Sequence, residues 1–356
     1  MKNQFKVAAK TLLLGSAIAA VSAGVSAQDQ QIEQVVVWGS ESDQRANSVS
    51  PISVLNQEDF RAINVATTED VVKFEPSVVI RRRFIGDSNG VLGMRGSNMF
   101  QTSRSMVFAD GVPLHYLLQS RWNGAPRWTM VSSSEIAQVE VIYGPFSAEY
   151  SGNAMGGVVE IETAIPQQRE FHFDSSVFTQ NFDAYGFDGS VQGYKSFFSY
   201  GDKIGDTSVY FSVNRLDNEA QPQTFRAGSS SSAANPQVVT GSIVGNDDRS
   251  RPMNWFMDTG IVDTKTNNYK FKLGHDFGNW STLLNLAYED RRSVNDSANS
   301  YLRDTAGNTV YSGHVIDNGE QFFVPASRFA SDDLQRDSLN VGLRLRGNLT
   351  ESVELE

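Results

Sequence analysis

From residue 168 onward, apolar and polar residues alternate along the chain with the period of two that belongs to β-strands with unlike faces. In the clearest stretch, Leu339, Val341, Leu343 and Leu345 alternate with Asn340, Gly342, Arg344 and Arg346. Six strands are predicted in this way, at about 168–179, 188–200, 207–216, 266–276, 280–290 and 336–347. Because aliphatic and basic side chains fall on opposite faces, these strands separate water from an apolar medium, which is either a protein core or lipid.

The lengths of the connections favour lipid. Three joins are short turns, at 201–206, 277–279 and 348–351, and the join at 181–187 is modest. The joins at 217–265 and 291–335 are long. Short turns at one end of a sheet and long loops at the other are typical of an outer-membrane barrel. A soluble sandwich has no reason to sort its loops by side.

Residues 40–165 show a mixed α/β pattern instead. Asn56 and Thr67 each precede an aspartate by three positions and predict the starts of short helical segments. The central stretch is Val139–Ile161, in which two alternating strands flank a glycine-rich connection. A phosphate-binding loop is not indicated, because no Lys-Ser/Thr pair follows the glycines and no helical pattern opens after them.

Composition and the N-terminus narrow the class of protein. Residues 1–27 combine lysines, an apolar core at Leu12–Ala20 and a small residue before Gln28, the pattern of a cleaved signal peptide. No later segment reaches the length of a transmembrane helix, so the exported protein is expected to be periplasmic, secreted or a β-barrel. The net charge of −11 argues against nucleic-acid binding, and the absence of cysteine excludes disulfides and thiolate chemistry.

The Val139–Ile161 stretch closely resembles the end of the plug domain of TonB-dependent outer-membrane receptors. The matching residues are Val139-Glu140-Val141-Ile142, Gly144-Pro145, Ser147-Ala148, Tyr150, Ala154 and Gly156-Gly157. Met94-Arg95-Gly96 and Val107–Leu114 match two further motifs of the same family. Tyr143 departs from the family pattern, because an arginine is usual at that position.

This resemblance implies an α/β plug domain followed by antiparallel transmembrane β-barrel strands. The expected organisation is a signal peptide at 1–27, a TonB box segment at 28–39, a plug domain at 40–165 and a partial barrel at 166–356. The family barrel has about 22 strands. Six strands and the start of a seventh at Val353-Glu354-Leu355 are too few to close around a plug, so we expect an N-terminal fragment of such a receptor.

The resemblance also implies a partner at the N-terminus. Glu33, Gln34, Val35, Val36 and Val37 resemble the TonB box, the segment gripped by the periplasmic protein TonB and its proton-driven inner-membrane complex. An extended, β-branched run can add a strand to the edge of the partner's sheet. The alternative interpretation is that Val35–Val37 is simply the first strand of the plug.

Other candidate site residues lie on the plug. Arg95 matches the family arginine that latches the plug to glutamates of the barrel wall. The two outward loops, Arg81–Gly90 and Leu114–Trp128, combine arginines with aromatic residues, which suits an anionic or planar ligand. The ligand-binding candidates are Arg81, Arg82, Arg83, Tyr116, Arg121, Trp122, Arg127 and Trp128. The alternative is that these arginines are buried against carboxylates of the barrel.

These features together predict a TonB-dependent receptor in the outer membrane of a Gram-negative bacterium. It would import a scarce extracellular solute, a ferric siderophore-type chelate, by proton-gradient-energised remodelling of the plug. The alternatives are a receptor of the same fold for haem, cobalamin, carbohydrate or copper, or a passive channel or adhesin. His115 and Met99 lie near the outward loops, but a lone histidine or methionine is a weak sign of haem or copper. No enzyme signature appears, and we expect no catalytic residue, no metal site and no cofactor.

Overall fold

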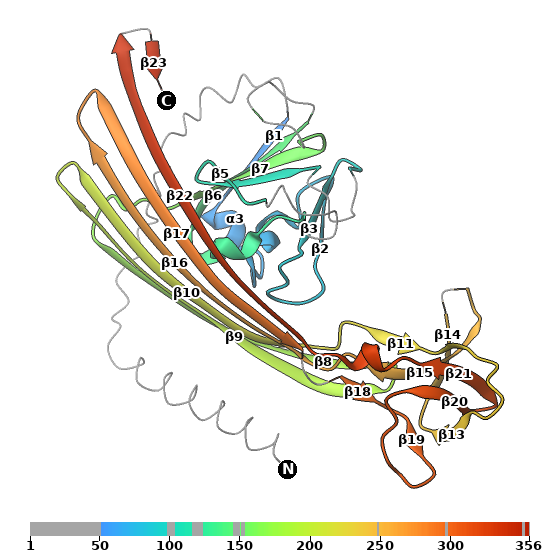
Figure 1. Cartoon of the computed structure of the whole chain (residues 1–356). Coiled ribbons are helices and arrows are strands. Elements are labelled where there is room, and N and C mark those ends of the chain that lie inside the picture. Colours follow the sequence, from blue (N-terminus) through green and yellow to red (C-terminus); the bar gives the residue numbers. More distant parts are fainter. Residues whose placement is uncertain are drawn as a thin grey trace. The chain divides into compact units, whose positions relative to one another are not determined.

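The computed structural model describes residues 51–97, 104–115, 124–144, 150, 154–247, 249–295, 298–350 and 353–355. The predicted signal peptide and the predicted TonB box lie outside the described residues. Figure 1 shows a small α/β part, coloured blue to green, and a set of long strands, coloured green to red. We call residues 51–165 the plug and the sheet of long strands the wall.

The plug is built on a five-stranded sheet of order β1-β6-β7-β4-β5. Its strands are β1 (Ile52–Asn56), β4 (Met106–Ala109), β5 (Val112–Pro113), β6 (Ile136–Tyr143) and β7 (Gly157–Thr163). β6 and β7 are antiparallel, and β4 joins β7 in parallel. A separate hairpin pairs β2 (Val78–Arg81) with β3 (Val91–Met94). The predicted pair of strands around the glycine-rich connection is therefore present as β6 and β7.

Short helical segments cover this sheet. They are α3 (Gln57–Arg61) and the 3-10 helices η1 (Thr68–Val72), η2 (Trp128–Met130) and η3 (Ser133–Glu135). Asn56 caps α3 and Thr67 begins η1, as the spacing of the aspartates predicts. The plug core is apolar and is filled by buried side chains from η1, η2, the strands and the segments next to them: Val71, Val72, Leu92, Met94, Val107, Leu114, Trp128, Ile136, Val139, Val141, Val159 and Ile161, among others.

The wall is a seven-stranded sheet of order β23-β22-β17-β16-β10-β9-β8. Its strands are β8 (Glu170–Ala184), β9 (Phe187–Ile204), β10 (Thr207–Ala220), β16 (Val262–Asp276), β17 (Trp280–Asn295), β22 (Asp332–Thr350) and β23 (Val353–Leu355). All neighbours are antiparallel. Each of the six predicted strands is present and is longer than predicted.

One of the sequence-based connections needs correction, and one predicted turn is confirmed. The modest join expected at 181–187 is a tight turn at Tyr185-Gly186, where both residues have positive φ (52° and 87°). A tyrosine seldom adopts this conformation, so Tyr185-Gly186 is not a recognisable signal for a tight turn. The Asp110-Gly111 turn between β4 and β5 was predicted, and both residues do have positive φ (49° and 80°).

The two long joins are not simple loops, because their strands pair with each other. The first join contributes β11 (Phe225–Ala227), β12 (Ser229–Ser230), β13 (Gln237–Thr240), β14 (Ile243–Asn246) and β15 (Pro252–Asp258). The second contributes β18 (Asn299–Ser300), β19 (Arg303–Asp304), β20 (Gly313–Asp317), β21 (Glu320–Val324) and η4 (Ala326–Phe329). β12 pairs with β21, β13 with β19 and β20, and β15 with β18. We call this unit the loop lobe.

The loop lobe has its own apolar core. Eight buried side chains form it: Val239, Phe256, Met257, Leu302, Val310, Val315, Phe322 and Val324. Both joins contribute to this core, so neither join could bury its apolar residues alone. The individual strands are two to seven residues long, which is too short for a period-two pattern to stand out in the sequence.

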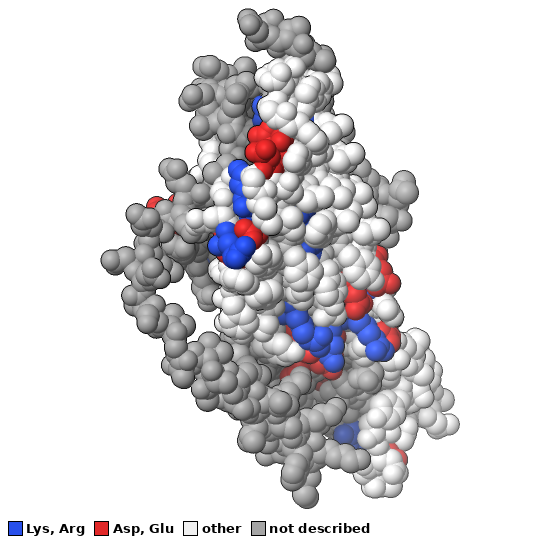
Figure 2. All heavy atoms as spheres, turned by 90° about the vertical axis from the view of Figure 1, so that its left-hand side faces the viewer, with Lys and Arg blue, Asp and Glu red and all other residues white. Residues whose placement is uncertain are grey.

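The wall has apolar side chains on its outward face, the reverse of a soluble sheet. Cross-strand registry aligns them in rows, such as Val209, Leu273, Leu284 and Leu343, or Phe211, Phe271, Leu286 and Val341. Leu343 is 66% exposed and Leu339 is 67% exposed. Figure 2 shows the outward face, on which charged side chains gather in a few clusters and most of the surface between them is uncharged.

The apolar rows on the outward face of the wall form a band, and the structure shows where this band ends toward the loop lobe. Tyr269 and Tyr288 are direct cross-strand partners, with ring centroids 6.3 Å apart. The next outward row toward the loop lobe is polar and contains Arg215, Asn267, Asp290 and Asp337. A tyrosine pair between an aliphatic band and a charged row is the arrangement expected at a membrane–water interface. No helix in the described part of the chain is both long enough and apolar enough to cross a membrane.

The facing of the wall predicts opposite outcomes for two neighbouring substitutions in β22. Leu343→Arg in the full-length protein should destabilise the assembled barrel by about 2–4 kcal/mol, because it places a charge on the lipid face. Arg344→Leu changes the inward face and should be milder. The check is the heat resistance of the folded barrel during electrophoresis, and equal losses in both variants would contradict the facing.

Candidate functional site: the interface between plug and wall

The inward face of the wall carries charged side chains that are buried against the plug. Lys270 and Lys272, neighbours on the inward row of β16, are 4% and 1% exposed. Burying an amine without a partner is costly, so each needs a counter-charge. The plug provides two carboxylates for this purpose, Asp110 and Glu135.

These four residues form a closed ion-pair network. Lys270 Nζ lies 2.9 Å from Glu135 Oε1 and 3.7 Å from Asp110 Oδ2. Lys272 Nζ lies 3.1 Å from Asp110 Oδ1 and donates to the Thr163 carbonyl at 2.9 Å. Two positive charges meet two negative charges, so the network as a whole is neutral.

Local structure fixes each carboxylate. Asp110 occupies the tight turn after β4, where it also accepts hydrogen bonds from the Thr163 amide (2.9 Å) and hydroxyl (2.8 Å). Burial alone would raise the pKa of Asp110, but the charges of Lys272 and Lys270 and the bonds from Thr163 lower it to about 2. Asp110 is therefore ionised at neutral pH.

Glu135 both caps a helical segment of the plug and binds side chains of the wall. As the third residue of the capping box that begins at Ser132, its Oε1 accepts from the Ser132 amide at 3.0 Å. The same carboxylate pairs with Lys270, and its Oε2 accepts from the Ser212 hydroxyl of β10 at 3.0 Å. A helix cap of the plug is thus also a docking point for the wall.

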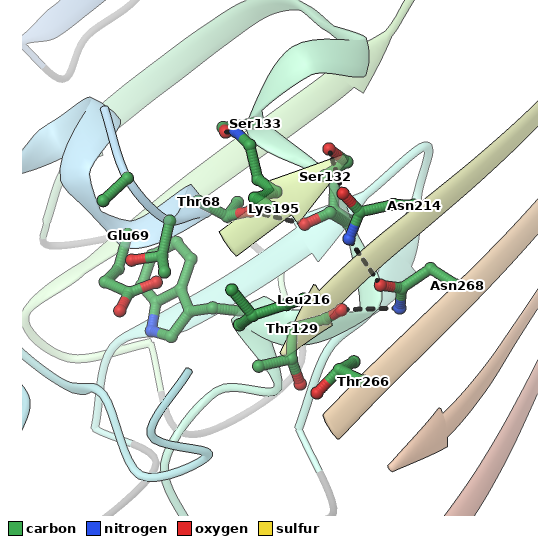
Figure 3. Close-up of a pocket in the computed structure, with 14 residues that line it drawn as sticks. Thr68, Glu69, Thr129, Ser132, Ser133, Lys195, Asn214, Leu216, Thr266 and Asn268 are labelled. Atoms are coloured by element: carbon green, nitrogen blue, oxygen red, sulfur yellow. Dashed lines mark hydrogen bonds between the residues drawn. The ribbon is translucent and has the colours of Figure 1, made fainter. Parts of the chain in front are cut away.

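Beside the ion pairs, uncharged polar groups connect plug and wall around a small cavity (Figure 3). Asn214 of β10 donates to Asn268 of β16 at 3.0 Å, and Asn268 donates to the Thr129 carbonyl at 2.7 Å. Lys195 of β9 donates to the Ser133 hydroxyl at 3.0 Å. The cavity encloses about 30 Å³, which is room for a water molecule and not for a solute.

The outward loop at 81–90 also contacts the wall through its backbone. Asn218 donates to the Ile85 carbonyl and Arg291 to the Gly86 carbonyl, both at 3.0 Å. Gly86 has φ of +82°, and a Cβ atom there would lie 2.7 Å from a methyl carbon of Leu216. Glycine is therefore required at this close approach.

The arginines predicted to bind ligand at 81–83 have different surroundings. Arg82 pairs with Glu69 at 3.2 Å and Asp70 at 3.0 Å inside the plug. Arg83 makes two bonds of 2.9 Å to Asp87. Arg81 is exposed. Two of these three arginines are therefore paired with carboxylates. This agrees with the alternative to ligand binding, except that the carboxylates belong to the plug and not to the barrel.

The remaining candidates divide into three groups. Trp128 is 1% exposed and donates to the Gly90 carbonyl at 2.8 Å, so it is a core residue and offers no face for stacking. Arg127 is buried next to the wall. Three further candidates lie outside the described residues: Tyr116, Arg121 and Trp122.

Arg95 has a backbone conformation that is unusual for a residue other than glycine, with φ of +49°. Its side chain donates to the Gly144 carbonyl in the plug, and its amide donates to the Ser77 carbonyl at 2.9 Å. Within the described residues it has no ion pair with a glutamate of the wall. Its role as a latch therefore stays a prediction.

His115 has a structural role. Its Nε2 accepts from the Val107 amide at 3.1 Å, and Nδ1 donates to the Gly124 carbonyl at 3.1 Å. Burial lowers the pKa of His115 to about 4, so the ring is neutral and both nitrogens are in use. No group of three or more metal-ligating side chains occurs among the described residues.

Sequence reasoning missed the network that joins plug and wall. The alternation marked Lys270 and Lys272 as polar, and the Asp110-Gly111 motif marked a turn, but nothing connected them. The partners are 162 positions apart in the case of Asp110 and Lys272. A usable signal was present, since two lysines on the inward row of one strand require carboxylates opposite.

Comparison with known proteins agrees with this architecture. Residues 44–158 match the TonB-dependent Receptor Plug Domain. The chain is 30% identical to the vitamin B12 transporter BtuB of Vibrio vulnificus (strain YJ016) over 170 residues, 46% of this chain and 26% of that protein. Residues 44–158 are therefore a plug domain of the TonB-dependent receptor family, and the chain is similar to outer-membrane proteins of Gram-negative bacteria.

Two solved structures share the fold. The ferripyoverdine receptor of the outer membrane of Pseudomonas aeruginosa aligns with a TM-score of 0.50 and 12% identity, over 84% of this chain and 32% of the receptor. The peptide importer RagAB aligns with a TM-score of 0.53 and 11% identity, over 86% of this chain and 40% of the importer chain. The chain thus spans well under half the length of each of these proteins.

The ion-pair network predicts a large effect of a small substitution. Asp110→Asn should destabilise docking of the plug by about 3–5 kcal/mol, because it leaves Lys272 buried without a counter-charge. Adding Lys272→Met should recover part of the loss. Asp333→Asn breaks an exposed pair with Arg292 and should cost at most about 1 kcal/mol. Urea titration of the full-length protein, with protease cleavage of the plug as readout, measures all three; similar values for Asp110→Asn and Asp333→Asn would contradict the assignment.

The ionisation of Asp110 also predicts that docking of the plug depends on pH. The pKa of Asp110 is lowered from 3.8 to about 2, so its contribution is fully present above 3.8 and is lost as the pH falls through about 2. Docking of the plug should therefore weaken as the pH falls across this window. The Asp110→Asn variant should show a flatter profile in the same urea titration. A wild-type profile as flat as that of the variant would show that Asp110 is not ionised in the folded protein.

Proposed function

We propose that this protein imports a scarce anionic solute, a ferric siderophore-type chelate, across the outer membrane by energised movement of the plug. The observation that carries the proposal is the polar character of the interface between plug and wall. The contacts across it are mainly ion pairs, side-chain hydrogen bonds and bonds to backbone carbonyls, and a small apolar contact joins Phe84 of the plug to Ala220 and Val262 of the wall.

A polar interface is suited to repeated opening in the presence of water. Separating two apolar surfaces costs about 25 cal/mol for each Å² exposed. Separating hydrogen-bonded groups exchanges protein partners for water, at a net cost of about 0.5–1.5 kcal/mol for each bond. Since the plug keeps its own apolar core, it can leave the wall without exposing that core.

The energy source belongs to the proposal too. We infer that TonB binds Glu33–Val37 by strand addition and transmits force from the inner-membrane proton gradient. The support is the sequence of this segment and the plug domain that follows it. A passive channel or an adhesin would not require such a segment.

Two observations bear on the solute. Arg81 is exposed on the plug, and Arg127 faces further arginines of the wall with too few carboxylates to balance them, which supports an anion. The identity shared with a vitamin B12 transporter supports cobalamin as a second candidate. A cell-based uptake assay of the full-length gene, with labelled ferric chelates and labelled cobalamin offered separately, distinguishes them. Uptake of cobalamin alone would overturn the chelate proposal.

Energy coupling predicts that binding and uptake can be separated. Val36→Pro removes a backbone donor and fixes φ, so it should abolish uptake while surface binding of ligand persists. Val35→Pro covers the other hydrogen-bonding register. Val36→Thr keeps the β-branched preference and should be tolerated. Surface-bound and accumulated ligand are measured in the same cells. Normal uptake in both proline variants would mean that these valines are an ordinary plug strand or that transport needs no energising partner.

A further inference from the structure

Two arginines face each other directly across neighbouring strands of the wall. Arg291 of β17 and Arg336 of β22 are register partners on the inward face. Arg291 is 2% exposed and the side chain of Arg336 is 19% exposed. Like charges directly opposite on one face of a sheet are destabilising, and burial increases the effect. This pairing therefore calls for a compensating group.

A third arginine approaches from the plug. Arg127 is 8% exposed, and its backbone bonds to Leu114 and Met130, but its guanidinium makes no hydrogen bond or ion pair with any residue in the described part of the chain. Burial is the main cause that lowers the pKa of Arg127 to about 10, and the positive charge of Arg336 adds to it. The plug thus places a positive charge against a wall that is already positive.

Among the residues that the structure describes, one carboxylate is free to compensate these three charges. Glu289 is fully buried and lies 3.5 Å from Arg336. Asp87 also faces Arg291, but both of its oxygens already bind Arg83. The cluster of Arg127, Arg291, Arg336 and Glu289 therefore keeps two positive charges in excess. The network at Lys270 and Lys272, by contrast, is balanced.

Several hydrogen-bonding atoms in this cluster have no partner. Among the described residues, Arg291 Nε, Arg336 Nε and Glu289 Oε2 are buried and make no hydrogen bond. Buried polar atoms are almost always paired, so three orphans in one cluster indicate a missing group. Arg292 next in sequence makes two bonds to Asp333, at 2.9 and 2.6 Å, on the other face of the same strand. The lack of hydrogen-bond partners is therefore confined to the inward face of the wall.

We propose that Arg127, Arg291 and Arg336 form an oxyanion site that bridges plug and wall and takes a carboxylate or similar group of the transported solute. This deepens the proposed function, on which it rests. Guanidinium groups bind planar oxyanions through paired hydrogen bonds, and Nε is one of the donors that such binding uses. Because Arg127 belongs to the plug and the other two to the wall, an anion bound here contacts both and relieves their repulsion.

The test uses the purified full-length receptor in detergent with citrate and inorganic phosphate as probes. Calorimetry should show binding of at least one probe to the wild type. Arg336→Gln and Arg291→Gln should each weaken it by about tenfold or more, the loss expected for a charge-assisted pair. Arg292→Gln, the matched control on the outward face, should bind like the wild type. Absence of binding by both probes, or equal binding by all variants, would overturn the site.

A second measurement separates an anion site from a structural cluster. Without added anion, Arg336→Gln should raise the temperature of unfolding, because it removes a like-charge repulsion. Citrate or phosphate, whichever binds, should raise that temperature in the wild type and not in the variant. A lower unfolding temperature in Arg336→Gln would show that the arginine only holds Glu289, against the proposal. Uptake that survives in cells while anion binding is lost would overturn this site alone, whereas intact binding with no energised uptake of any solute would overturn the proposed function.

Discussion

The buried pairing of Lys270 and Lys272 with Asp110 and Glu135 is the contact on which the arrangement of plug and wall depends. A wall with apolar residues outward must turn its polar residues inward, and buried charges there need partners. The plug brings those partners on two of its most constrained elements, a tight turn and a helix cap. The wall and the plug are therefore complementary in charge, and the apolar contact of Phe84 with Ala220 and Val262 adds to these polar contacts.

The loop lobe is stabilised in a different way, through an apolar core that the two long joins share. Its strands are short, and only by pairing the two long joins does it obtain a core that includes Phe256 and Leu302. The hairpin at Tyr185 also contacts it, since Tyr185 lies 4.9 Å from Trp255 and 5.1 Å from Phe225 between ring centroids. Connections that fold together in this way behave as one body, so a substitution in one join affects the other.

Local patterns allowed much of this fold to be predicted. Alternation located the wall strands, the Asp110-Gly111 pair located a turn, and the aspartates after Asn56 and Thr67 located two helix starts. The features that were not predicted depend on contacts between residues distant in the sequence or on unusual local conformations. Trp128 looked like a ligand-stacking residue because a sequence does not show that its indole reaches Gly90. The lobe was missed because contacts between its two joins connect residues far apart in the sequence, such as Met257 with Ser300 and Ser242 with Asp317.

The way the wall holds the outward loop of the plug has a consequence for specificity. Asn218 and Arg291 bind the backbone carbonyls of Ile85 and Gly86, and Asn268 binds that of Thr129. Docking through carbonyls does not depend on most side chains of the loop; the exceptions are the glycine needed for close approach and Phe84, which packs against Ala220 and Val262 of the wall. Exposed positions such as Arg81 can therefore change with the ligand while the loop stays attached. Arg127 is the exception, because its charge lies at the boundary itself, and this is why an unbalanced charge there points to a bound anion.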